Sequence, residues 1–216
     1  MRDPQTTSEF WDEQHSIGHL GNLSGYSAEG ELGDLRARHL VRPGIKVLNI
    51  GLGMGYTTEH LIASGCEVSI HDISKVALKK FSGRVAGAYL PEDLPKLPTR
   101  YFDLALSHLV MQHMCDEALV PQVRHVIRSL APAGVFACQF VVAWAQTEPS
   151  FRYSTEVEEA LPYCRSLHWM SGIIEDAGGM IVSAELSENF PQYRFGWYVV
   201  HAIRQDSFPQ YVARLR

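Results

Sequence analysis

The chain has 216 residues and a formal net charge of −5; 46% of its residues are hydrophobic and 20% are charged. This composition is typical of one globular domain large enough to bury its own core, so its four cysteines are not needed as staples. Because the 19 Lys and Arg residues are scattered, a small-molecule partner is favoured over nucleic acid. The most apolar stretch, residues 135–145, is too short to span a bilayer. No signal peptide or C-x-x-C motif is present, so we expect a cytoplasmic protein without membrane contact.

Apolar runs alternate with amphipathic stretches from residue 45 onward, which predicts an α/β fold. The pattern predicts strands over residues 45–50, 66–71, 85–89, 102–107 and 135–143. It predicts helices over residues 56–64, 74–81 and 163–177, and a further helix that starts near Pro121 and ends at Leu130. Two last strands, 180–186 and 197–203, are only about 10 residues apart. That distance is too short for a helical crossover, so we expect them to pair antiparallel at the edge of a mostly parallel sheet.

A glycine-rich turn, residues 51–55, follows the first predicted strand. Glycine allows positive φ and a close approach of the backbone to a ligand, and ligands of open parallel sheets bind at such strand ends. A dinucleotide fingerprint needs a third glycine where this chain has Tyr56, which disfavours a pyrophosphate. Asp72 ends the next strand, 21 positions after Gly51. This spacing suits a nucleoside whose ribose hydroxyls are accepted by a carboxylate.

With these residues the chain resembles the class I S-adenosylmethionine-dependent methyltransferases, whose first motif usually reads D/E-x-G-x-G-x-G. The resemblance covers residues 40–205 and includes Asp72 in HDIS, the segments 97–104 and 130–136, and the closing hairpin. It implies a Rossmann-like, seven-stranded, mostly parallel sheet with helices on both faces. Residues 1–40 would then be a cap, 41–205 the methyltransferase domain with a substrate-side insertion at about 145–168, and 206–216 a tail.

The same resemblance implies how S-adenosylmethionine would be held. Gly51 and Gly53 would lie against the methionine moiety and the ribose, and Asp72 would accept the ribose hydroxyls. Four further residues complete the expected cofactor site: Ile73 packing on the adenine, Asp93 accepting its amino group with Leu94 beside it, and Ser107 near the methionine part. Glu92 competes with Asp93 for its role.

The first motif departs from the family pattern at one position, because Asn49 replaces the usual acid. An amide offers the amino group of the cofactor only a neutral hydrogen bond, so we expect a lower cofactor affinity.

Methyl transfer is an in-line displacement that requires alignment and the removal of at most one proton. His108 and His113 follow the fourth strand and are the candidate bases, and His113 matches a histidine that many small-molecule members of the family carry. Either residue could instead be structural. Their spacing of five residues places them on different helix faces, and no acidic cluster accompanies them, so no metal is expected.

The acceptor pocket is expected between the cap and the segment after the fifth strand. Its candidate residues, each of which could equally be plain packing, are Trp11, His15, Tyr26, Gln139, Trp144 and Tyr153. The predicted acceptor is a hydroxyl, less readily an amine, of a small molecule, sugar, glycan precursor or secondary metabolite. A catalytically silent binding protein and, with less support, a nicotinamide-dependent oxidoreductase are the alternatives. A homodimer stays an open option.

Overall fold

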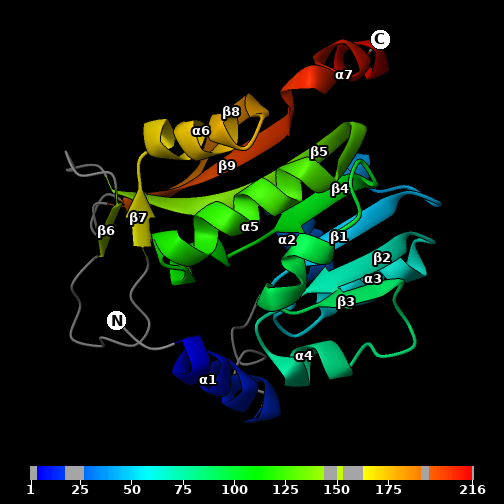
Figure 1. Ribbon diagram of the computed structural model, residues 1–216, viewed down its shortest axis with the longest axis vertical. Helices are drawn as coiled ribbons and strands as arrows, with labels where there is room; N and C mark the ends of the chain where they lie inside the picture. The colour runs from blue at the N-terminus through cyan, green and yellow to red at the C-terminus, as the bar shows by residue number, and fades with distance from the viewer. Residues whose placement is uncertain (1–3, 18–26, 144–149, 153–162, 191–194, 216) are drawn as a thin grey trace.

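The computed structural model describes residues 4–17, 27–143, 150–152, 163–190 and 195–215. Its strands form one mixed sheet in which β3 (Gly87–Tyr89), β2 (Glu67–His71), β1 (Lys46–Ile50), β4 (Phe102–Ser107) and β5 (Leu130–Ala143) lie side by side and parallel. β9 (Phe195–Arg204) pairs antiparallel with β5 and with β8 (Gly179–Phe190). The mostly parallel sheet and its antiparallel closing hairpin are therefore confirmed (Figure 1).

Two short strands join the seven that the sequence predicts. β7 (Tyr163–Arg165) pairs with β5 through Cys164 and Val141, and β6 (Ser150–Arg152) pairs with β7. β9 already occupies one edge of β5 along residues 136–143, so β7 must lie on the other edge, the one that β4 uses as far as Cys138. β7 thus extends the sheet just beyond the carboxyl end of β4.

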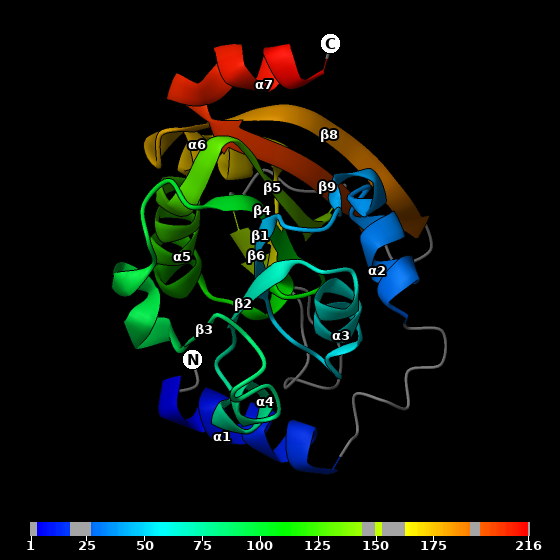
Figure 2. The same ribbon diagram turned by 90° about the vertical axis from the view of Figure 1, so that its right-hand side faces the viewer.

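Helices cover both faces of the sheet. On one face α5 (Asp116–Ser129) and α6 (Leu167–Asp176) bury apolar side chains in one core cluster. On the other face α2 (Ala28–Asp34) and α3 (Tyr56–Ala63) build a second cluster, to which α4 (Lys75–Lys79) also contributes. Figure 2 shows the sheet between these two layers, with α5 on one side and α2 and α3 on the other. The predicted three-layer arrangement is confirmed.

Two predicted helix boundaries are wrong. α5 begins at Asp116, five residues before Pro121, because Leu119 N–H already bonds to the carbonyl of Cys115 and acidic residues suit a first turn. Pro121 is tolerated because it lies on the exposed side and removes a single donor. Residues 163–165 are strand rather than helix, and α6 begins only after Ser166, whose hydroxyl accepts the N–H of Trp169 at 3.1 Å.

The two ends of the sheet differ in their surroundings. α1 (Pro4–Ile17) lies beside α4 at one end, and α7 (Phe208–Arg214) lies at the opposite end (Figure 2).

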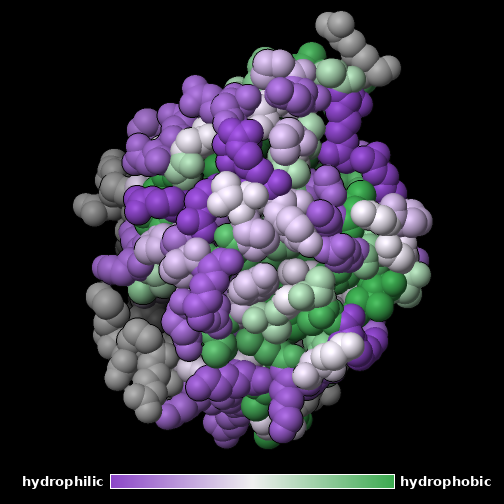
Figure 3. All heavy atoms as spheres, turned by 45° about the vertical axis from the view of Figure 1, so that its right-hand side comes forward, coloured by the Kyte–Doolittle hydropathy of each residue, from purple (hydrophilic) through white to green (hydrophobic). Residues whose placement is uncertain are grey.

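On the face drawn in Figure 3, hydrophilic side chains dominate the upper part and hydrophobic ones gather in the lower half. No helix in the described ranges is long and apolar enough to cross a membrane.

Candidate functional site

The glycine turn after β1 has an open side and a packed side. Gly51, Gly53 and Gly55 have φ values of +74°, +50° and +91°, a region that favours glycine. A Cβ atom on Gly51 would meet Cγ2 of Val110 at 2.0 Å, whereas a Cβ on Gly53 would have no neighbour within 4 Å. The backbone at Gly53 therefore faces space that a ligand can enter, and the loop after β4 closes over Gly51.

Asp72 lies at the end of β2 and is only 7% exposed. Its Oδ2 accepts the N–H of Leu52 at 2.7 Å, and its Oδ1 accepts the N–H of Ser74 at 2.8 Å. Each carboxylate oxygen has more than one acceptor position, so both can still receive a hydroxyl group. The carboxylate thus joins the glycine turn to the next loop, and it suits the predicted ribose contact.

His71 is a residue whose role sequence reasoning missed. Its Nδ1 lies 2.9 Å from the carbonyl oxygen of Tyr89, and its Nε2 lies 3.0 Å from Oε1 of Gln122 in α5. These contacts hold the last residue of β2, and with it Asp72, against the neighbouring strand and helix. No motif in the sequence signals this role, since the partners are 18 and 51 residues away.

Asn49 is buried and turns toward α3, where its Nδ2 donates a hydrogen bond of 2.9 Å to Oγ1 of Thr58. Leu94 is also buried, at 5% exposure, and belongs to the core cluster under α5. Asp93 accepts from Nζ of Lys96 at 2.6 Å and from the N–H of Leu90 at 3.2 Å, and the Lys96 partner lowers the pKa of its carboxyl. The adenine contacts expected of Asp93 and Leu94 stay predictions.

Helix α1 is fastened over the end of β2. Oγ of Ser8 donates to the carbonyl of Ile73 at 3.1 Å. Oδ1 of Asp12 accepts from Oγ of Ser74 at 2.6 Å and from the N–H of Val76 at 3.2 Å. Helix α1 therefore lies beside Ile73 and Ser74, next to the residue expected to hold the ribose, while the cap over residues 1–40 stays a prediction.

Trp11 of this helix and His113 of the loop after β4 are brought together. Their ring centroids are 5.3 Å apart in an edge-to-face arrangement. Desolvation lowers the pKa of His113 to about 4, while the residue keeps an exposed surface. His113 is neutral at pH 7 and can accept a proton or a hydrogen bond.

His108 has different neighbours. Its Nε2 lies 3.3 Å from Oδ2 of Asp34, the last residue of α2, and its side chain is 9% exposed. Desolvation lowers the pKa of His108, against the opposing effect of the nearby carboxylate. The two candidate bases thus contact different N-terminal helices: His113 contacts α1, and His108 contacts α2.

Several buried polar atoms at this end of the sheet lack a partner among the described residues. They are Oγ of Ser107 at the end of β4, Oε1 of Gln139 in β5 and Nδ1 of His15 in α1. Desolvation lowers the pKa of His15, and the negative charge of Asp72 opposes that shift. Because buried polar groups are normally paired, these atoms are the kind that a polar ligand satisfies. The predicted pocket residues Tyr26, Trp144 and Tyr153 lie outside the described residues.

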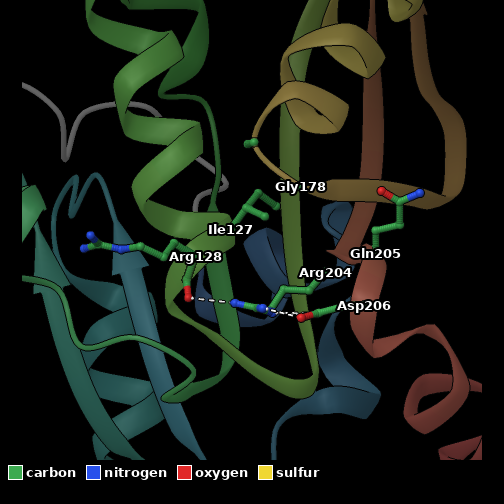
Figure 4. A pocket seen from close by; sticks show the side chains of 7 residues that line it. Ile127, Arg128, Gly178, Arg204, Gln205 and Asp206 are labelled. Atoms are coloured by element: carbon green, nitrogen blue, oxygen red, sulfur yellow. Dashed lines mark hydrogen bonds and ion pairs between the residues drawn. The ribbon is translucent and has the colours of Figure 1, made fainter.

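A hollow lies at the opposite end of the sheet, away from this site. It has a volume of about 600 Å³ and lies where β9 ends and β8 begins; its lining residues are Ile127, Arg128, Ala177, Gly178, Arg204, Gln205 and Asp206. Arg204 binds the carbonyl of Arg128 and the carboxylate of Asp206 there, while the guanidinium of Arg128 points away (Figure 4). Within the described ranges, no three His, Cys, Asp or Glu side chains gather in a way that could hold a metal ion.

A comparison with known families agrees with this geometry. The site combines a glycine turn, a strand-end carboxylate and unpaired polar atoms at one end of the sheet. Residues 47–134 match the model of the methyltransferase domain. Over this segment, which contains the glycine turn and Asp72, the chain is similar to the methyltransferase domain family. The predicted resemblance is therefore confirmed for this part of the chain.

Among curated relatives, the chain is 31% identical over 140 residues to malonyl-(acyl-carrier protein) O-methyltransferase of Enterobacter lignolyticus (strain SCF1). The match covers 63% of this chain and 53% of that protein. The chain therefore spans about half the length of this relative.

Two solved structures share the fold over nearly the whole chain. The 1,6-didemethyltoxoflavin-N1-methyltransferase of Burkholderia thailandensis, solved with 1,6-didemethyltoxoflavin and S-adenosylhomocysteine, has a TM-score of 0.68 at 18% identity and covers 95% of this chain and 92% of its own. The (4+2)-cyclase SpnF has a TM-score of 0.70 at 16% identity, with coverages of 93% and 96%. At these identities the likeness concerns the fold, which serves more than one reaction.

Proposed function

We propose that this protein is a methyltransferase that uses S-adenosylmethionine to methylate a small molecule. The observation that carries the proposal is the arrangement around Asp72: a buried carboxylate beside the open backbone of Gly53, inside the segment that matches the methyltransferase domain. The cofactor supplies a methyl group activated by sulfonium. Asp72 would accept the ribose hydroxyls, and the unpaired Oγ of Ser107 would meet a polar group of the methionine part.

The residues of the chain fit this cofactor. The glycine backbone allows close approach, the carboxylate is pre-oriented by two N–H donors, and α1 covers the nucleoside end through contacts to Ile73 and Ser74. The Nδ2 of Asn49 donates to Thr58, and its amide is uncharged, so Asn49 offers no negative charge to the amino group of the cofactor. We therefore expect binding that is weaker than with an acid at this position.

For the acceptor we propose a hydroxyl group. His113 is neutral at pH 7, makes an edge-to-face contact with Trp11 and keeps an exposed surface. Its ring would accept the hydrogen bond of the hydroxyl and take the proton as the oxygen attacks the methyl carbon. Trp11 would offer an aromatic wall to the body of the acceptor. An amine is the second choice. A neutral amine attacks the methyl carbon without help from a base, so an amine acceptor would give the ring of His113 no role in the reaction.

The test combines binding with turnover. We would titrate the full chain with S-adenosylmethionine, S-adenosylhomocysteine and NADH by calorimetry, then measure transfer of radiolabelled methyl groups to a panel of phenols, sugars and amines. Binding of the first two ligands alone, with labelled products from hydroxyl acceptors, is the expected result. Binding without product from any acceptor would favour a catalytically silent binding protein. Binding of NADH alone would favour an oxidoreductase, and labelled products from amines alone would overturn the hydroxyl assignment.

A further inference from the structure

Arg165 in β7 is a charged side chain that the site described above does not use. The residue is 1% exposed, and its guanidinium has no exposed surface. Its neighbour Cys164 pairs with Val141 of β5 and Phe151 of β6, so the backbone that presents Arg165 is anchored in the sheet. Burying a cation completely is costly unless partners compensate it, so its contacts indicate what it is for.

Within the part of the chain that the structure describes, the side chain of Arg165 donates its hydrogen bonds to residues 111–116, which lie between β4 and the first turn of α5. Nη1 donates to the carbonyl of Met111 at 2.9 Å, and Nη2 donates to the carbonyl of Met114 at 2.5 Å. Nε and Nη2 also donate to Oδ1 of Asp116, at 3.0 and 2.8 Å. One planar guanidinium thus binds three points along six residues, at the N-terminal end of α5 and through the turn before it.

Two aromatic rings lie near the guanidinium and restrict it further. It lies over the ring of Tyr163 at 5.3 Å and over the ring of Trp169 at 5.2 Å. Arginine is suited to such a place, because its fork of donors is rigid and its plane stacks on aromatic rings. A lysine would offer one compact charge on a flexible stem and could not bind all three points.

The segment that Arg165 binds carries His113. The turn Met111–His113 is followed by Met114 and Cys115 and then by Asp116, so two of the three points bracket His113 closely. We propose that Arg165 is a positioning residue, which holds residues 111–116 so that the ring of His113 meets Trp11 at the carboxyl end of β4. The inference rests on the proposed function for its catalytic consequence, but not for its structural one.

Hydrogen–deuterium exchange of the full chain tests the structural part without turnover. In Arg165→Met, we expect the amides of residues 109–115 to exchange at least about tenfold faster, while those of β1, β2 and α3 keep their rates. Arg165→Lys should show a smaller increase in the same residues. The matched control is Arg84→Met, which removes an exposed arginine from its ion pair with Glu59 on another part of the surface.

The catalytic part is tested by a comparison of kcat with cofactor binding. Arg165→Met should lower kcat by about tenfold or more, Arg165→Lys by less, and Kd for S-adenosylmethionine should change by less than about threefold in both. Asp116→Asn keeps the arginine and weakens its main partner, so it serves as a second variant should Arg165→Met fail to fold. We expect it to raise exchange in the same residues.

Three results would overturn the inference. The first is unchanged exchange in residues 109–115 in the folded variants. The second is an increase spread evenly over the sheet, which would make Arg165 an ordinary core residue. The third is a local increase with full kcat, which would separate this segment from catalysis. If the wild-type chain transfers no methyl group, the proposed function fails while the exchange result still decides the positioning role.

Discussion

The carboxylate of Asp12 accepts a hydrogen bond of 2.6 Å from the hydroxyl of Ser74, across 62 residues of chain. The same oxygen accepts the N–H of Val76, while Ser74 accepts the N–H of Ala77. Two N–H groups in the first turn of α4 are therefore satisfied by two side chains, one of which belongs to α1. This shared cap fastens α1 over the end of β2.

Removal of this cap should loosen α1. We expect Asp12→Ala to lower the free energy of unfolding by about 0.5–2 kcal/mol, the range found for lost helix caps. Urea unfolding measures the change, and Glu13→Ala at the exposed next position is the control. Equal stabilities of the two variants would mean that α1 is held by other contacts.

Loss of Asp72 should weaken the binding of S-adenosylmethionine. A charge-assisted hydrogen bond contributes about 1.5–3 kcal/mol, which corresponds to a rise in Kd of roughly 10- to 150-fold for Asp72→Ala. The variant should also unfold more easily, because the N–H groups of Leu52 and Ser74 lose their acceptor. Calorimetry measures Kd, with exposed Asp176→Ala as the control. An unchanged Kd in the folded variant would contradict the ribose assignment.

Two glycines in one turn should respond differently to alanine. Both have positive φ, which costs an alanine about 1–2 kcal/mol. In Gly51→Ala the new methyl group also overlaps Val110, so this variant should be the less stable one in thermal unfolding. In Gly53→Ala the methyl group enters open space. We expect this variant to show the larger rise in cofactor Kd relative to its loss of free energy of unfolding. The reverse order would show that the ligand space lies elsewhere.

His113→Ala should lower kcat and leave cofactor Kd unchanged, while the exposed His39→Ala changes neither. The pH profile gives a second check. A base acts when it is unprotonated, and the lowered pKa of about 4 leaves His113 neutral above that value. The kcat of the wild type should therefore stay level from about pH 8 down to pH 6 and fall only as the pH approaches 4. A fall centred near pH 6.5 would indicate a histidine with an ordinary pKa.

The sheet could be predicted because its signals are local. β1 and β4 are mostly buried and apolar and lie between turn residues, β2 is buried over residues 68–71, and β4 has the predicted bounds, residues 102–107. The error at residues 163–165 arose where partners outside the segment decide the structure, whereas the start of α5 is set locally by the carbonyl of Cys115 and an acidic first turn. Cys164 is in a strand because Val141 and Phe151 pair with it. The sequence of residues 160–168 contains no signal for this strand.

The same distinction holds for the site. Gly51 and Gly53 are required by a local turn, and Asp72 is a carboxylate at a predicted strand end. One amino-acid sequence is therefore enough to find these three residues. The contact of Trp11 with His113 and the hold of Arg165 on Met111 depend on how segments about 50 to 100 residues apart pack. An arginine that acts by being buried leaves no pattern in its neighbours.

The placement of the two terminal helices has a practical consequence. α1 is fastened directly above the expected nucleoside site, whereas α7 reaches the other end of the molecule, where Arg214 binds the carbonyl of Ala133. An affinity tag or fluorophore fused ahead of α1 would therefore lie closer to the expected nucleoside site than the same label placed after α7. The C-terminal position is the better choice for binding measurements.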